Sequence, residues 1–159
     1  MREIFRLFVT YSQIAVFNSD LEVQTNDWKD VHVAQGFAWR PGSVSFGTLV
    51  DSYPLYVEVQ QATGVELRPE TVRAIVVPFF VSPAGHVGLS DMGNDVSTAI
   101  PPGPYALVFE TGYVSNDIED GTWVRLSFIP QSNVEPAILR VDEGLNPPDI
   151  LDMHAAPII

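Results

Sequence analysis

The sequence has no cysteine, and its 159 residues include only one lysine, Lys29. Without cysteine there can be no disulfide, no thiolate metal ligand and no cysteine nucleophile. This absence is compatible with the cytoplasm, where we expect the protein to reside. The sequence also has no run of about 18 apolar residues, so we expect no transmembrane helix.

Basic residues are scarce as a class. The chain has 8 Lys and Arg against 20 Asp and Glu, for a net charge of −12. Such a surface repels nucleic-acid phosphates and anionic membranes, so we expect no direct nucleic-acid binding. It would instead attract cations or a basic protein partner, although acidic charge can also serve solubility alone.

Recognisable catalytic motifs are missing as well. The three histidines, His32, His86 and His154, are far apart and lie in no HxH or HExxH pattern, which argues against a histidine metal site. No Gly-rich phosphate loop and no GxSxG elbow occurs. Ser90 and Asp91 lie near His86, but closeness in sequence does not give the geometry of a catalytic triad. We therefore predict that the protein is not an enzyme and carries no cofactor.

The sequence is rich in short apolar segments separated by its 13 prolines and 11 glycines. The clearest is Ala74 to Val81, eight apolar residues that predict a buried strand. The turn residues 82–85 and the strand-like segment 86–89 follow, so we predict a hairpin at the centre of a sheet. Pro78 lacks an amide donor and predicts a bulge or an edge-facing position there.

Other segments alternate in the same way. In 53–61, Leu55, Val57 and Val59 share one face, while Glu58 and Gln60 point the other way and predict a wet face. Pro41-Gly42 predicts a type II turn between two strands. The N-terminal segment 3–17 is one long bent strand or two short ones.

Turn signals recur every eight to twelve residues along the chain, with alternation also at 96–100, 104–113, 122–129 and 137–141. We predict an all-β fold, an antiparallel β-sandwich of about eight to ten short strands with at most one short helix. Residues 1–159 are expected to form a single domain. Within it, 142–159 is a Pro-rich acidic C-terminal tail that either lies over the sheet or is mobile.

Residues 26–36 are ambiguous. Val31 and Val33 would alternate in a strand, but we favour a short helix that Asn26 or Asp27 caps and Gly36 ends. Asp30 would then lie in its first turn.

Two clusters of polar residues are candidate sites. Asp91, Asn94 and Asp95 surround a glycine and form a calcium candidate, although the same residues are common in ordinary turns. An acidic loop with Asp117, Glu119 and Asp120 precedes Trp123. Charges steer and aromatics anchor protein interfaces, so these four residues are our candidate partner-binding set; a solvated turn beside a core tryptophan is the alternative.

Several segments together resemble a known family. In order they are YSQIAVF, DWKD, QGFAWRPGSVSF, VPFFVSPAGHVGL and PPGPYALVFE, and they span about residues 10–113. They look like the competence protein J family, small acidic bacterial inhibitors of the DNA-entry nuclease. The segment from Ile129 onward shows no such resemblance.

The resemblance implies a non-enzymatic protein that binds and silences a nuclease. It agrees with the charge, since a surface of −12 suits the basic cleft with which a nuclease grips DNA. The alternative is a β-sandwich module that binds calcium or carbohydrate. It would use the 91–95 loop or the aromatic residues Trp39, Tyr53 and Trp123.

Overall fold

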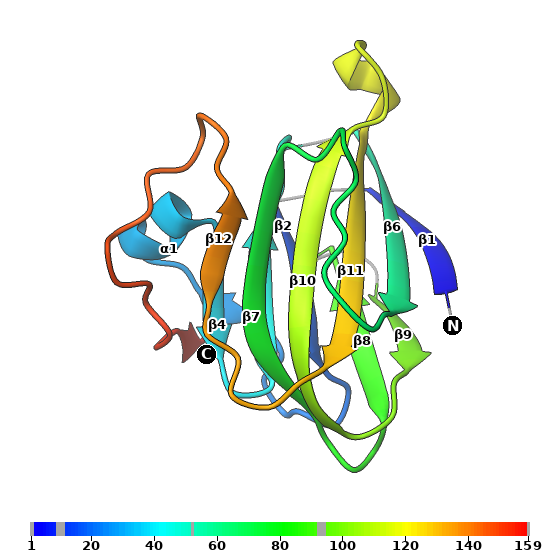
Figure 1. Ribbon diagram of the computed structural model, residues 1–159, viewed down its shortest axis with the longest axis vertical. Coiled ribbons are helices and arrows are strands. Elements are labelled where there is room, and N and C mark those ends of the chain that lie inside the picture. The colour runs from blue at the N-terminus through cyan, green and yellow to red at the C-terminus, as the bar shows by residue number, and fades with distance from the viewer. Residues whose placement is uncertain (1, 9–11, 52, 92–94, 159) are drawn as a thin grey trace.

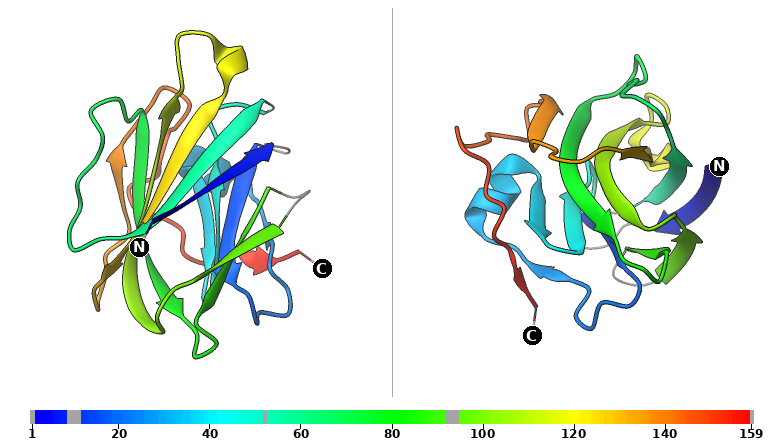
Figure 2. Two further views of the ribbon diagram at one scale, coloured as in Figure 1. Left: turned by 90° about the vertical axis from the view of Figure 1, so that its right-hand side faces the viewer. Right: turned by 60° about the horizontal axis from the view of Figure 1, so that its bottom comes forward.

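The computed structural model describes residues 2–8, 12–51, 53–91 and 95–158, which form two face-to-face β-sheets (Figure 1, Figure 2). Sheet A contains β1 (Arg2–Phe8), β6 (Pro54–Gln61), β7 (Arg73–Val81), β10 (Gly103–Tyr113), β11 (Thr122–Pro130) and β12 (Ala137–Arg140). Sheet B contains β2 (Gln13–Asn18), β4 (Phe37–Arg40), β5 (Ser43–Gly47), β8 (His86–Ser90) and β9 (Asp95–Ala99). The shorter elements are β3 (Asn26–Asp27), α1 (Asp30–Gln35), the 3₁₀ turn η1 (Ile118–Asp120) and β13 (Ala156–Pro157).

The strand order is β1-β6-β11-β10-β7-β12 in sheet A and β4-β5-β2-β8-β9 in sheet B, and β3 pairs with β13. These thirteen strands of the described residues confirm the predicted all-β fold. One feature differs from an antiparallel sandwich. Strands β6 and β11 are parallel, so sheet A is mixed.

The core lies between the two sheets, where alternate side chains of each strand meet. The ring of Phe46 in sheet B stacks on that of Phe109 in sheet A, with 4.5 Å between centroids. Leu55, Val57 and Val59 are all buried, as their spacing predicts. Period-two alternation therefore identified the inner face of these strands correctly.

Two of the four connections that cross from one sheet to the other, β1–β2 and β7–β8, bear on the sequence predictions. The N-terminal segment forms two strands, β1 in sheet A and β2 in sheet B, with Tyr11 outside the described residues. Strand β7 belongs to sheet A and β8 to sheet B, so the predicted hairpin at 74–89 is wrong. The turn itself is present, because the N–H of Gly85 donates to Ser82 at 2.9 Å.

The physical reason for the crossing is visible at the end of β7. Asn18, on β2 of sheet B, donates from Nδ2 to the carbonyl of Phe80 and accepts from the N–H of Ser82. This side chain ties the end of β7 to the opposite sheet. Strand β7 instead pairs with β10 and β12, and it is the fifth of six strands, not the centre.

Pro78 faces the edge of sheet A, as one of the two predicted alternatives has it. Its register with Ala106 on β10 is regular, and β12 pairs with β7 only over residues 74–76. The Pro78 carbonyl accepts from Nε1 of Trp39 at 2.7 Å. Pro78 has no N–H to donate, and its carbonyl is already hydrogen-bonded. This edge of the sheet is therefore poorly suited to adding a strand.

The prediction of a wet outer face on β6 is wrong at Glu58, which is only 7% exposed. Segment 62–70 lies over this part of sheet A (Figure 1). Arg68 from that segment and Arg2 from β1 both form ion pairs with Glu58. On β10, two strands away from β6, Glu110 is 1% exposed and pairs with Arg125 of the intervening β11. Buried carboxylates of this kind persist because cations and hydrogen bonds compensate for lost hydration.

The short helix is confirmed, but its predicted start is wrong. Helix α1 begins at Asp30 after Lys29, and Gly36 ends it with φ 87°. Asn26 is buried in β3 instead, where Nδ2 donates to the carbonyls of Ala38 and Ser43. The side chain that was expected to cap the helix is thus used to hold β4 and β5.

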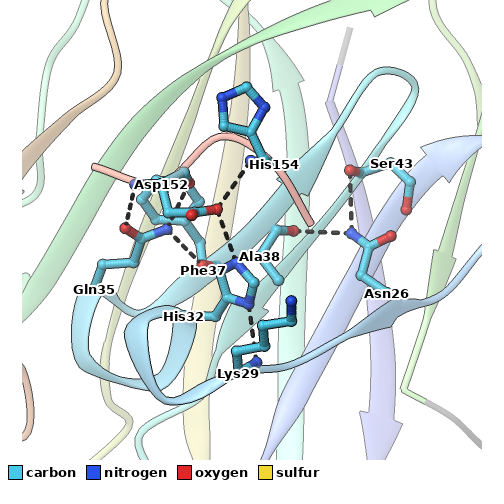
Figure 3. Close-up of polar contacts among 9 residues, drawn as sticks. All are labelled: Asn26, Lys29, His32, Gln35, Phe37, Ala38, Ser43, Asp152 and His154. Carbon is cyan, nitrogen blue, oxygen red and sulfur yellow. Dashed lines mark hydrogen bonds and ion pairs between the residues drawn. The ribbon is translucent and has the colours of Figure 1, made fainter. Parts of the chain in front are cut away.

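The C-terminal tail lies against α1 and β4 (Figure 3). Asp152 is its anchor: Oδ1 lies 3.0 Å from Nε2 of buried His32, and the backbone of Asp152 exchanges two hydrogen bonds with Gln35. Nδ1 of His32 accepts from the N–H of Lys29, so the ring proton is on Nε2. The N–H of His154 and the ring of His32 hold the pKa of Asp152 below its usual value.

Gly88 tests the packing of sheet B. A Cβ there would lie 2.3 Å from Cε2 of Phe17. We expect Gly88→Ala to lower the free energy of unfolding by about 1–3 kcal/mol, because the ring must move from its packed position. Urea denaturation measures this. Gly64→Ala is the control, since a Cβ added there would meet nothing within 4 Å, and we expect a change within about 0.5 kcal/mol. Equal losses for the two variants would contradict the packing described.

Candidate partner-binding surface

The exposed charge is even more one-sided than the composition. Fourteen of the twenty carboxylates are exposed, against four of the eight basic side chains. The less exposed arginines are used internally: Arg68 and Arg125 pair with carboxylates on the outer face of sheet A, and Arg73 pairs with Asp142. Partners that approach the protein therefore meet a predominantly negative surface.

The loop between β10 and β11, residues 114–121, projects from one end of the sandwich (Figure 1). Asp117 caps η1, since its Oδ1 accepts from the N–H of Glu119 at 3.0 Å. Oδ2 of Asp120 accepts from the Ser115 hydroxyl at 2.6 Å. These bonds fix the backbone of the loop while Asp117, Glu119 and Asp120 remain exposed.

The base of this loop is closely packed. Gly121 has φ 93°, and a Cβ there would lie 2.2 Å from the carbonyl oxygen of Pro54. The N–H of Val114 donates to the Gly121 carbonyl at 3.1 Å across the loop. Only glycine fits this position, so the loop leaves the sheet in a defined direction.

The structure separates Trp123 from the three carboxylates. Trp123 is 8% exposed, beneath the Arg68 guanidinium, which lies 4.6 Å from the ring centroid. The exposed apolar groups on and beside the loop are Tyr113, Val114 and Ile118, at 42%, 47% and 47%. Sequence reasoning missed them, although Ile118 stands out as the apolar residue of an otherwise acidic turn.

Further carboxylates lie at the same end of the sandwich. Arg73 is opposite Thr111 in the β7–β10 register, two residues before Tyr113, and it binds Asp142. Asp51 is three residues before Pro54, which lies at the base of the loop. Glu70 precedes β7 at this end and is exposed. We call the exposed carboxylates at this end the acidic end: Asp51, Glu70, Asp117, Glu119, Asp120 and Glu143.

The Arg73–Asp142 pair fixes the tail to the acidic end. Nε and Nη2 of Arg73 donate to the two carboxylate oxygens at 2.7 and 3.0 Å, and Nη1 donates to the Gly47 carbonyl. Burial would by itself raise the pKa of Asp142. The hydrogen bonds and charge of Arg73, with the N–H of Gly144, bring it below its ordinary value. Asp142 is therefore ionised at neutral pH.

The other candidates are the calcium set, which is only partly described, and the triad set. Asp91 is buried, Asp95 is exposed and Asn94 lies outside the described residues. Across the described ranges, no group of three or more His, Cys, Asp or Glu could hold a metal ion. His86 and Ser90 are at opposite ends of β8, about 13 Å apart at the usual strand rise, so they cannot form a triad.

Two of the aromatic residues of the carbohydrate alternative, Trp39 and Trp123, lie far apart. Trp39 bonds Pro78, near the end of sheet A where β10 begins. Trp123 is opposite Gly112 at the other end, beside the acidic loop. Trp39 and Trp123 therefore cannot form one sugar platform.

No helix in the described part of the chain has the length and apolarity to cross a membrane.

One family model and two solved structures are similar to this chain. The family model for Competence protein J (ComJ) matches residues 6–129. The crystal structure of ComJ from Bacillus subtilis, an inhibitor of the DNA degrading activity of NucA, is similar with a TM-score of 0.68 and 19% identity. That match covers 81% of this chain and 96% of that one. The protein of crocagin biosynthetic gene J is similar with a TM-score of 0.53 and 12% identity, over 83% and 99% of the two chains. No curated protein matched the chain.

Asp142→Asn tests the pair that anchors the tail. It leaves the Arg73 charge buried without its counter-charge, and we expect a loss of about 2–4 kcal/mol in the free energy of unfolding at pH 7. Because the folded pKa of Asp142 is lowered, the stability from its charge is present above the unfolded pKa of about 4 and is lost as pH falls through the folded value.

The difference between wild type and this variant should therefore shrink below pH 4 in urea denaturation. Asp149→Asn, at an exposed carboxylate of the tail, is the matched control and should behave as wild type. A difference that stays constant from pH 7 to pH 3 would contradict the assignment to Asp142.

Proposed function

The chain belongs to the competence protein J family, and we propose that it binds and inhibits a DNA-degrading nuclease. The family match over residues 6–129 is the observation that carries this proposal. The similar crystal structure of ComJ, named as an inhibitor of such an activity, supports it. The acidic end supplies the negatively charged surface that binding to a DNA-degrading nuclease would need.

Inhibition would work by occupation of the DNA-binding cleft. A nuclease that grips DNA must present Lys and Arg to the phosphates, whose contacts dominate DNA affinity. The carboxylates of the acidic end would take the place of those phosphates. Long-range attraction between a surface of −12 and a basic cleft would also speed the encounter. The inhibitor itself would perform no catalysis and need no cofactor.

The projecting loop would be the central contact. Asp117, Glu119 and Asp120 supply charge on a fixed backbone, so little conformational entropy is lost on binding. Ile118 and Tyr113 supply exposed apolar surface between and beside these charges. An interface typically gains its affinity from a few such anchors, while the charges set orientation and rate.

The first test uses a nuclease that co-purifies with the chain, in a DNA-cleavage assay. We expect saturating protein to abolish cleavage. The variant Asp117→Asn, Glu119→Gln, Asp120→Asn should raise the inhibition constant about tenfold to a hundredfold at low salt, mainly through slower association. The loss should shrink at about 0.5 M salt, where charges are screened.

The matched control removes the same charge elsewhere, with Glu22→Gln, Glu135→Gln and Asp149→Asn. All three are exposed. Glu135 follows β11, at the end of sheet A away from the projecting loop. If this control loses as much inhibition as the loop variant, net charge and not the loop is responsible. Undiminished cleavage with saturating wild-type protein would end the inhibitor proposal.

Ile118→Ser tests the apolar anchor separately from charge. We expect about a tenfold weaker inhibition from faster dissociation, with an association rate and salt dependence like those of wild type. Stopped-flow or surface-binding kinetics measure both rates. Val65→Ser, at another exposed apolar residue (56%) on segment 62–70, should leave inhibition unchanged. A wild-type dissociation rate for Ile118→Ser would remove Ile118 from the interface.

A further inference from the structure

A cavity of about 360 Å³ lies between α1, β5, the start of β7 and the tail. Trp28, Val33, Gly47, Arg73 and Leu145 are among the residues that line it. The Trp28 indole is held in place, since its Nε1 donates to Gln13 at 3.0 Å. The volume falls within the range of small-ligand sites, and the walls combine apolar and aromatic surface with a few polar groups.

Three exposed carboxylates are near residues that line this cavity. Asp51 accepts a hydrogen bond of 2.7 Å from Ser12, which lines the cavity. Glu143 is exposed and precedes Gly144, another lining residue. Asp30 is exposed one helical turn before Val33 on the same face of α1. The exposed Lys29 follows the lining residue Trp28, so three carboxylates against one ammonium leave the surroundings of this largely apolar cavity net negative.

Arg73 does not reverse this charge. The residue is only 6% exposed, and its guanidinium is bound by both carboxylate oxygens of Asp142, whose ionised form the pair stabilises. The two charges cancel as a pair. Asp30, Asp51 and Glu143 then set the sign of the potential that an incoming group meets.

We infer that this cavity takes a cationic side chain of the nuclease, an arginine, in addition to the contact made by the projecting loop. The aliphatic stem of arginine suits the apolar walls, and its guanidinium can lie against Trp28 and toward the three nearby carboxylates. Charge complementarity selects this occupant, since an anionic or neutral group gains nothing from these carboxylates. The inference rests on the proposed nuclease partner.

The position of the cavity fits a shared interface. Arg73 lies opposite Thr111, at the end of sheet A from which the 114–121 loop projects. A basic surface that contacts the loop would thus extend toward the cavity. Val33 is 62% exposed there, so a side chain can enter without unfolding the helix.

The test needs no nuclease. The ¹⁵N-labelled protein has three indole N–H signals, and Trp28 is the tryptophan that lines the cavity. Acetyl-arginine amide is titrated to millimolar concentration, with acetyl-citrulline amide, its uncharged near-isostere, as the control. We expect the Trp28 signal, assigned with Trp28→Phe, to shift saturably with the arginine probe and at least about twofold less with citrulline.

Two variants of Val33 give the sign of the effect. Val33→Lys should weaken the arginine probe about two- to fivefold, and Val33→Glu should tighten it by a similar factor. Position 33 is exposed and helical, so neither variant should disturb folding, which a thermal melt checks. No shift of Trp28, equal shifts from the two probes, or equal affinities of the two variants would each overturn the inference.

These outcomes are separable from those of the proposed function. If the protein inhibits cleavage but its Trp28 signal does not shift, the proposed function is supported and the arginine site is wrong. If the protein binds the probe but does not slow cleavage, the arginine site is supported and the proposed nuclease inhibition is wrong. Val33→Lys should also weaken inhibition about two- to fivefold, and unchanged inhibition by this variant would count against the site in the complex.

Discussion

Each strand of the two large sheets has one face that must be buried against the opposite sheet, and this constraint determines what the rest of the chain can do. The stacked Phe46 and Phe109 rings mark the plane where the sheets meet. Side chains that point inward are unavailable to a partner. Recognition is therefore left to the outer surface and to the connections between strands, of which the 114–121 loop projects farthest in Figure 1.

The few basic residues of the chain contribute to the same result. Arg68, Arg73 and Arg125 hold the 62–70 segment and the tail in place through ion pairs with carboxylates of low exposure. A buried carboxylate without such a cation would be costly, so these arginines are committed to the scaffold. The unpaired negative charge is left at the surface. An acidic surface and a stable outer face of sheet A are thus two effects of one distribution of arginine.

Local patterns in the sequence predicted the strands and their inner faces, because alternation depends only on neighbouring residues. The same patterns gave wrong predictions where contacts with segments distant in the sequence determine the structure. A four-residue turn after β7 suits a hairpin as well as a crossing, and the choice depends on Asn18, 62 residues before Phe80. Glu58 and Trp123 have the spacing of an outer face, but the sequence does not say that 62–70 covers it. For the same reason the sequence does not show that Trp123 is covered while Tyr113 and Ile118 are exposed.

The C-terminal segment has a consequence for how the protein folds. His32 and Asp152 are 120 residues apart, and Ala155 donates to the Trp39 carbonyl at the edge of β4. Contacts between residues so far apart in the sequence form late, and domains rich in such contacts fold in about milliseconds to seconds. Until β12 and the tail dock, the edge of β4 and the 74–76 part of β7 that β12 covers stay open to strands of other chains. Once docked, residues 130–158, which lie beyond the match to the family model, would close these edges and so limit aggregation.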